Sequence, residues 1–503
     1  MTANYYVKAR RDFSLVISSS TVVSPKYFYV AFKDCMEAVI NTQMDFVMNS
    51  LPKLFRPLSI ITVIALLDAC GGGGSGHSAA PAKYSLAGSV SGLSNNGLVL
   101  SDGVQSTPQS LTLQANTSNG SSAFSFNGGA AYLMGGAQYN VAIQHQPIGN
   151  RCLVTNGAGN ISGNVTSIVV DCLAPTVSIF LSPTSYQSAT NNRGTNGPTS
   201  IALDAMGNVY TASQGQLLKT TPAGAASIIA LVDAIAHTPI TNPGIQQVAV
   251  DATGKIYVAA NPSGVGSVIQ MIDANGLVTT IAGSGVIGSD NGIGTSASFS
   301  NWIKGIVLDA HGNIFAADLG NNMIRKIAPD GSVSTFAGSG AQGSTDGPEA
   351  TASFNLNGAE GNIIAIDSAA NIYVVEWLND DVRKISPSGN VSTFAGNVAR
   401  FGETDGAGIT TASFGNPFGI ATDSRDNVYV LDGSSSIRMI QPDGSVSTLL
   451  NSGAPIYDSN NNVVTQNSAP KTCIASTGDG TLYFGATVIS SNFSGEILKT
   501  IFR

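Results

Sequence analysis

Charged residues are scarce in this chain. Only 11% of its 503 residues are Asp, Glu, Lys or Arg, against about 25% in an average globular protein. This composition excludes a coiled coil, a helical repeat and an acidic disordered tail. The 23 Lys and Arg residues leave a net charge of −8, and because binding nucleic acid requires a basic surface, we expect no nucleic-acid partner.

Cysteine and histidine are also rare. The chain has five Cys and four His, and no two Cys have the close spacing of a zinc site or a redox pair. So few Cys exclude a disulfide scaffold, and scattered His exclude a zinc centre. We therefore expect no cofactor, with Ca²⁺ as the one alternative, considered below.

No apolar run is long enough to span a bilayer, which takes about 20 residues. The longest, Leu58 to Leu67, follows Lys53 and Arg56 and has the layout of a secretory signal. The four residues LDAC that end at Cys70 resemble the lipobox of bacterial lipoproteins, although Asp68 replaces the small or apolar residue usual there. The resemblance implies that Cys70 is lipidated and becomes the mature N-terminus.

This assignment divides the first part of the chain. We expect residues 48–69 to be the signal peptide and 70–83 to be a flexible Gly/Ser-rich linker. Because a signal is N-terminal, 1–47 is interpreted as a non-native or mis-assigned extension, with the true start at Met48 or Met44. The alternative is a genuine cytoplasmic extension followed by an internal signal anchor.

The expected signal peptide and lipobox also predict where the protein is located. The protein would cross the inner membrane and stay in the cell envelope, held by acyl chains on one Cys without spanning the membrane. The lipobox resemblance favours the outer membrane, because Gly71 stands where inner-membrane lipoproteins carry Asp. We expect a monomer.

Residues 84–173 predict a small β-sandwich. Short alternating runs such as Leu98-Val99-Leu100 are separated by Gly, Asn and Ser, which is typical of an antiparallel sandwich. Cys152 and Cys172 are the natural disulfide and would contribute about 3 kcal/mol. The stretch resembles small sandwich modules of bacterial surface lipoproteins, and a spacer or adhesion role is expected.

Residues 174–503 contain six copies of one pattern. Two apolar residues and Asp are followed, four residues after the Asp, by Asn, an apolar residue and an aromatic one, as at Asp367, Asn371 and Tyr373. The second copy has Lys255 in place of the Asn, and the sixth copy is degraded, with Thr477 and Thr481. Copies about fifty residues apart, made only of strand-like segments, indicate four-stranded propeller blades. The sixth copy lacks its outermost strand, and we expect residues near 176–182 to supply it and close the ring. The expected fold class is thus all-β: a six-bladed propeller preceded by the disulfide-linked sandwich.

Several motifs carry a family resemblance. The segments Ile324-Arg325-Lys326-Ile327, Thr335-Phe336-Ala337-Gly338, Thr345-Asp346-Gly347 and Ala352-Ser353-Phe354 look like the NHL repeat family, in the variant seen in teneurin ectodomains. The resemblance covers about 176–503 and implies a six-bladed propeller.

One face of this propeller is expected to bind ligands. The connections between the second and third strands of a blade and those between blades lie on the same face, and the latter are long. We call this the long-loop face, and its candidate binding residues are Trp302, Asp318, Glu376, Trp377 and Asp432. Trp377 is either exposed for contact or packed over the neighbouring loop.

The three carboxylates leave two hypotheses open. Asp318, Glu376 and Asp432 could hold Ca²⁺ near the axis, which would make the protein a lactonase-like hydrolase, since NHL propellers are similar in shape to six-bladed lactonases. The favoured interpretation is that the Asp residues cap the following turn through backbone N–H groups. The recurring loop residues Asp290, Asp346 and Asp405 are interpreted as turn residues. We therefore favour a binding scaffold for a protein, glycan or small molecule over an enzyme.

Overall fold

The computed structural model describes most of the chain from residue 82 onward. The described residues are 82–502 without 95, 105–107, 116–120, 148–149, 183–184, 186–196, 214, 242, 263, 359–360, 434–435, 452–453, 458–462, 467–470 and 489–493, together with β1 (Tyr5–Ala9) and β2 (Phe13–Ile17). The chain divides into two compact units, 1–80 and 81–503. In the first, β1 pairs antiparallel with β2. The expected signal peptide and Cys70 lie outside the described residues, and none of the helices described is long and apolar enough to cross a membrane.

The second unit begins with the β-sandwich. Its elements are β3 (Lys83–Tyr84), β4 (Leu86–Ser91), β5 (Leu98–Ser101), β6 (Ser110–Leu113), β7 (Ser122–Ser125), η1 (Phe126–Gly129), β8 (Leu133–Met134), β9 (Gln138–Asn140), β10 (Ala142–His145), β11 (Arg151–Thr155), β12 (Ala158–Asn160) and β13 (Val165–Leu173). A four-stranded sheet β11-β13-β4-β7 and a three-stranded sheet β10-β5-β6 form its main layers. Leu86 and Ile168 from the first and Leu98 from the second are fully buried in one shared core.

The sandwich is not wholly antiparallel, so that expectation was wrong. The last strand, β13, runs parallel to the first, β4, with Val170 opposite Val90. A parallel pair needs a crossover connection, and here the rest of the module supplies it. Period-2 patterns identify strands but say nothing about which strands become neighbours.

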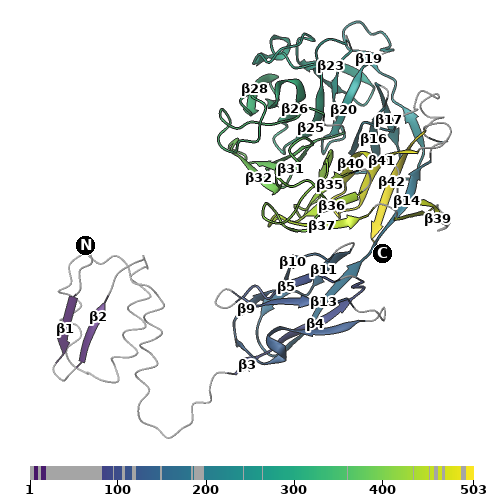
Figure 1. The fold of residues 1–503 in the computed structure, drawn as a ribbon. Coiled ribbons are helices and arrows are strands. Elements are labelled where there is room, and N and C mark those ends of the chain that lie inside the picture. Colours follow the sequence, from purple (N-terminus) through teal and green to yellow (C-terminus); the bar gives the residue numbers. More distant parts are fainter. Residues whose placement is uncertain are drawn as a thin grey trace. The chain divides into compact units, whose positions relative to one another are not determined.

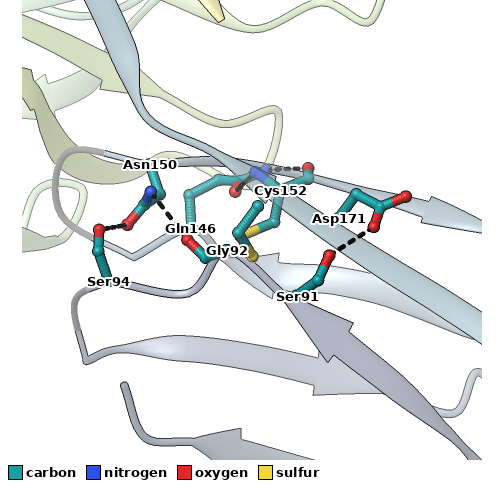
Figure 2. Close-up of a disulfide and its surroundings, with 8 residues drawn as sticks. Ser91, Gly92, Ser94, Gln146, Asn150, Cys152 and Asp171 are labelled. Carbon is teal, nitrogen blue, oxygen red and sulfur yellow. Dashed lines mark hydrogen bonds between the residues drawn. A yellow bond between two sulfur atoms is a disulfide. The ribbon is translucent and has the colours of Figure 1, made fainter. Parts of the chain in front are cut away.

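The predicted disulfide is confirmed. Cys152 of β11 and Cys172 of β13 are bonded and lie directly opposite each other in the ladder. Figure 2 shows Gln146 beside Cys152, where its amide side chain accepts from the Cys152 N–H at 2.7 Å and donates to the Cys152 carbonyl at 3.0 Å. The bridge and this amide clamp fix the edge of the four-stranded sheet.

The propeller follows after a single residue, Ala174. Its described strands form six blades, each with strands A to D from the inside outward. Blades 1 to 3 are β15 (Ser200–Leu203), β16 (Val209–Ser213), β17 (Gln216–Thr220) and β18 (Ala226–Ile228); β20 (Ile245–Val250), β21 (Ile256–Ala260), β22 (Val268–Ile272) and β23 (Leu277–Ala282); β25 (Ile303–Leu308), β26 (Ile314–Asp318), β27 (Met323–Ile327) and β28 (Ser332–Ala337). Blades 4 to 6 are β29 (Ile364–Ile366), β30 (Ile372–Glu376), β31 (Asp381–Ile385) and β32 (Val391–Gly396); β34 (Gly419–Thr422), β35 (Val428–Asp432), β36 (Ser436–Ile440) and β37 (Ser445–Leu450); β40 (Lys471–Ser476), β41 (Leu482–Val488), β42 (Ser494–Phe502) and β14 (Pro175–Leu181).

Short additions extend several blades at the outside. They are β19 (Val232–Asp233), β24 (Gly292–Ile293), β33 (Gly406–Ala407), β38 (Pro455–Tyr457) and β39 (Val463–Gln466), with 3-10 helices η2 (Gly294–Ser296) and η3 (Leu319–Asn321) in loops. The sequence pattern did not predict β38 and β39, which pair beyond β14 in blade 6.

The ring is closed by the segment predicted from the sequence, near residues 176–182. Strand β14 pairs antiparallel with the C-terminal strand β42, with Val177 opposite Thr500, and completes blade 6 (Figure 1). The inner strands of successive blades contact one another around the circle, and β40 meets β15. Strands from both ends of the propeller segment therefore share one sheet.

The repeated Asp of the first five copies holds the turn between strands A and B, and Thr477 takes its place in the sixth. In blade 4, Asp367 accepts from the backbone N–H of Asn371 at 2.7 Å, from the Asn371 side chain at 2.8 Å and from the Tyr373 hydroxyl at 3.0 Å. Blades 1 and 5 repeat all three bonds. The Asp, Asn and Tyr that revealed the repeat thus stabilise a turn, and this turn lies on the face opposite the long loops.

Candidate ligand-binding face

Each of the three candidate carboxylates is paired with an arginine of its own blade. Asp318 lies 3.1 Å from Arg325, Glu376 lies 2.7 Å from Arg383, and Asp432 lies 2.8 Å from Arg438, measured from carboxylate oxygen to Nη1. The acid ends strand B, and the arginine lies on strand C, two residues after the residue that stands opposite the acid in the ladder. All six side chains are fully buried.

The arginines hold the long loop that enters the blade. Arg383 donates through Nη1 to the Ser353 carbonyl and through Nη2 to Thr345 O and the Asp346 carboxylate. Its guanidinium also lies 5.5 Å from the Phe354 ring centroid. Arg438 makes the matching bonds to Ser413, Thr404 and Asp405, whereas Arg325 bonds the amide oxygen of Asn291 in place of a second acid.

The carboxylates bind the same loops. Asp318 accepts from Ser300 N at 2.9 Å, Asp432 accepts from Gly415 N at 2.7 Å, and Glu376 accepts from Asn355 N. These N–H groups belong to the incoming loop, so the expectation that Asp318 and Asp432 cap the turn after strand B through backbone N–H groups was wrong. Asp346 and Asp405 are ion-pair partners rather than turn residues, because a buried guanidinium requires paired acceptors.

This geometry gives the metal hypothesis no support. Each carboxylate is engaged by an arginine and a backbone N–H, and the described residues contain no group of three or more His, Cys, Asp or Glu side chains that could hold a metal ion. Burial raises the pKa of Asp432 to about 7, although Arg438 opposes that shift. The three acid–arginine pairs can instead hold the incoming loops in place through hydrogen bonds, which we call pinning.

The pinning is confined to blades 3, 4 and 5 among the described residues. At the arginine position, blades 1, 2 and 6 carry Leu218, Gln270 and Leu498, and at the acid position Ser213, Ala260 and Ala486. Only the loops that enter blades 3 to 5 carry the segment Ala-Ser-Phe. The acid, the arginine and the Ala-Ser-Phe segment thus occur together in the same three repeats. This pattern is visible in the sequence and could have indicated that the three groups interact, but the sequence analysis did not use it.

The axis is bridged by polar side chains. Asn362, just before β29, donates from Nδ2 to the carbonyls of Ile420 and Ile474, both at 2.8 Å, and accepts from Ile474 N at 2.9 Å. Gln247 of blade 2 donates to Gly361 O at 3.2 Å. Inner strands of four blades are thereby tied together across the axis, where the hydrolase hypothesis placed its site.

The two tryptophans differ in exposure. Trp302, directly before β25, is 48% exposed, and the Lys304 ammonium lies 5.2 Å from its ring centroid. Trp377 is half-buried and packs against the core and close to Gly358, so it covers the neighbouring loop. Trp302 is therefore the better candidate for ligand contact.

Further apolar side chains accompany Trp302 on this face. Among the described residues, large exposed hydrophobics lie in the connections of the long-loop face at Val265, Val286, Ile287, Trp302, Leu378, Val398 and Phe401, which we call the long-loop patch. Phe401 is 72% exposed. Loops that a rigid scaffold holds in position often carry binding residues.

Comparisons with known proteins give distant similarity. No protein-family model and no curated protein matches the chain. Among solved structures, a Bacteroides thetaiotaomicron protein of unknown function is 14% identical over 81% of this chain and 90% of its own, with a TM-score of 0.47. An auxiliary nutrient binding protein from the same organism is 11% identical over 84% and 99%, with a TM-score of 0.44. A gluconolactonase from Xanthomonas campestris is 13% identical over 62% and 88%, with a TM-score of 0.39. Similarity at this level assigns no activity to the chain.

Proposed function

We propose that this protein is a lipid-anchored component of the bacterial cell envelope whose NHL-like propeller binds another molecule through the long-loop face. The observation that carries the proposal is the long-loop patch, which is borne largely by loops that buried ion pairs hold in place. Trp302 and Phe401 are its main aromatic residues, and aromatic side chains dominate the binding energy of protein interfaces. A protein ligand fits such a surface best.

Binding is favoured over hydrolysis for a physical reason. A catalytic carboxylate must reach substrate, but Asp318, Glu376 and Asp432 are fully buried and each is bonded to an arginine. The lactonase alternative predicts one bound Ca²⁺ and a thermal shift on adding Ca²⁺ or EDTA. We expect no shift with either.

Site-specific photocrosslinking tests the binding face. A photoreactive amino acid placed at Phe401 in the full-length protein of producing cells should give a discrete crosslinked product. The same group at Met206, which is 72% exposed in a strand A to strand B turn, serves as the control. Identical products at both positions, or none at Phe401, would refute the proposal.

The anchor has its own test. Cys70→Ser should abolish incorporation of a labelled fatty acid and release the protein from membranes. Unchanged labelling would overturn the lipoprotein assignment and leave the binding face untouched.

A further inference from the structure

Blade 4 contains a second buried carboxyl group beside the pinning acid. Glu376 ends β30 and Asp381 begins β31, and the two residues are partners in the antiparallel register. Glu376 is 0% and Asp381 2% exposed. Oδ1 of Asp381 has no hydrogen-bond partner among the residues that the structure describes.

The charges around this pair do not balance. The groups that act on Asp381 are the carboxylates of Glu376 and Asp346 and the guanidinium of Arg383, so three acids share one cation. Asp380, the preceding residue, is committed elsewhere and accepts from Asn416 N at 2.9 Å. Two adjacent buried carboxyl groups cannot both ionise without a large electrostatic cost.

The other pinned blades lack this feature. The position of Asp381 is Met323 in blade 3, opposite Asp318, and Ser436 in blade 5, opposite Asp432. Ser436 donates to Glu403. The same loop architecture is therefore built without a buried acid at this strand position, since Glu403 of blade 5 is exposed and lies on the incoming loop, so Asp381 is not needed to form it.

We propose that Glu376 and Asp381 share one proton, and that release of this proton loosens the loop entering blade 4, so that the pair acts as a pH-sensitive latch beneath the long-loop face. With the proton on Asp381, the Glu376 carboxylate stays with Arg383 and Asn355 N. When the proton leaves to solvent, two anions face each other in the interior. Separation of β31 from the loop that carries Asp346 relieves this repulsion by admitting water.

The direction of the Asp381 pKa shift agrees with that geometry. Burial, together with the Glu376 carboxylate, raises the pKa of Asp381 well above its usual range, and Arg383 opposes the rise. The latch is thus closed in acid and opens as the pH rises through that raised pKa. Trp377 and Leu378 follow Glu376 directly, so opening alters the part of the long-loop patch that contains Leu378. This consequence for ligands rests on the proposed binding function.

Tryptophan fluorescence tests the latch without any ligand. The chain has two Trp, so Trp302→Phe leaves Trp377 as the single reporter in the full-length protein. Its emission should show a reversible transition at a pH well above the range in which an ordinary Asp titrates. Asp381→Asn and Asp381→Ser, which copies blade 5, should each abolish it, whereas the neighbouring Asp380→Asn should retain it.

Hydrogen exchange supplies a second readout. Amides of 338–356 should exchange faster at high pH, after correction for the intrinsic rate, in the parent and not in Asp381→Ser. A parent protein without a transition, or a transition that survives in Asp381→Asn, would overturn the latch. Because neither readout involves ligand, failure here is distinct from failure of crosslinking at Phe401.

Discussion

Nη1 of Arg438 lies 2.8 Å from Oδ2 of Asp432, and neither side chain is exposed to solvent. The same guanidinium bonds the carbonyls of Thr404 and Ser413 and lies 5.4 Å from the Phe414 ring centroid. One residue of strand C therefore joins the end of strand B to two facing segments of a long loop. The ion pair is best understood as a fastening for that loop.

Arg438→Leu should destabilise the propeller by about 3 to 5 kcal/mol, because it leaves the Asp432 carboxylate buried without its cation. The double variant Asp432→Ala/Arg438→Leu copies blade 6, which has Ala486 and Leu498 at these positions. Its cost should be smaller than the sum of the two single costs. Urea denaturation of the four proteins measures the coupling, and additive costs would contradict the interpretation.

Reduction of the Cys152–Cys172 bridge should destabilise the sandwich by about 3 kcal/mol, because the intact disulfide joins residues 20 positions apart and so restricts the unfolded chain. Thermal unfolding with and without reductant measures this effect. Cys473 is the matched control, because this free Cys is fully buried. Cys473→Ala should keep the sensitivity to reductant, and Cys152→Ala/Cys172→Ala should lose it.

Val177→Asp should open the ring. Val177 is buried in β14 between β42 and β38, and an unpaired charge there costs several kcal/mol. Hydrogen exchange should show that the amides of β42 lose protection before those of blade 3. Met206→Asp, at an exposed turn, is the control and should change the protection of neither blade. If Val177→Asp instead lowered protection equally in all blades, the ring would not depend on this strand pair in particular.

Glu496→Gln should change how stability depends on pH. Burial raises the pKa of Glu496 to about 7, so between about 4.5 and 7 the folded protein keeps a proton that the unfolded chain has lost. Stability from this group therefore falls as the pH rises through that window. The variant should be more stable than the parent at pH 8, by up to about 3 kcal/mol, and equal to it at pH 4. Equal stabilisation at both pH values would show that the effect is not titration.

The fold was predictable because its determinants are local and repeated. Asp367, Asn371 and Tyr373 form their bonds within seven consecutive residues, and the same triad recurs along the chain. The closing strand was predictable because 176–182 resembles the outer strands of other blades. Pairing between β4 and β13 was not, since alternation of apolar residues identifies strands and leaves their partners open.

The candidate site was only half predictable. Strand position correctly placed Asp318, Glu376 and Asp432 at one end of strand B, but their partners come from another strand and from a distant loop. Arg383, for example, reaches Asp346, 37 residues earlier. Side-chain partners at such separations follow from packing, which a single copy of the repeat does not specify.

One connection gives the molecule a mechanical property. Ala174 is the only residue between the sandwich strand β13 and the ring-closing strand β14. Any tension that enters from the N-terminal side is delivered along β14 to its ladder with β42. Two strands pulled along their length resist separation through many hydrogen bonds at once. The pair β14 and β42, which closes the ring, would therefore also carry a force applied to the propeller from the N-terminal side.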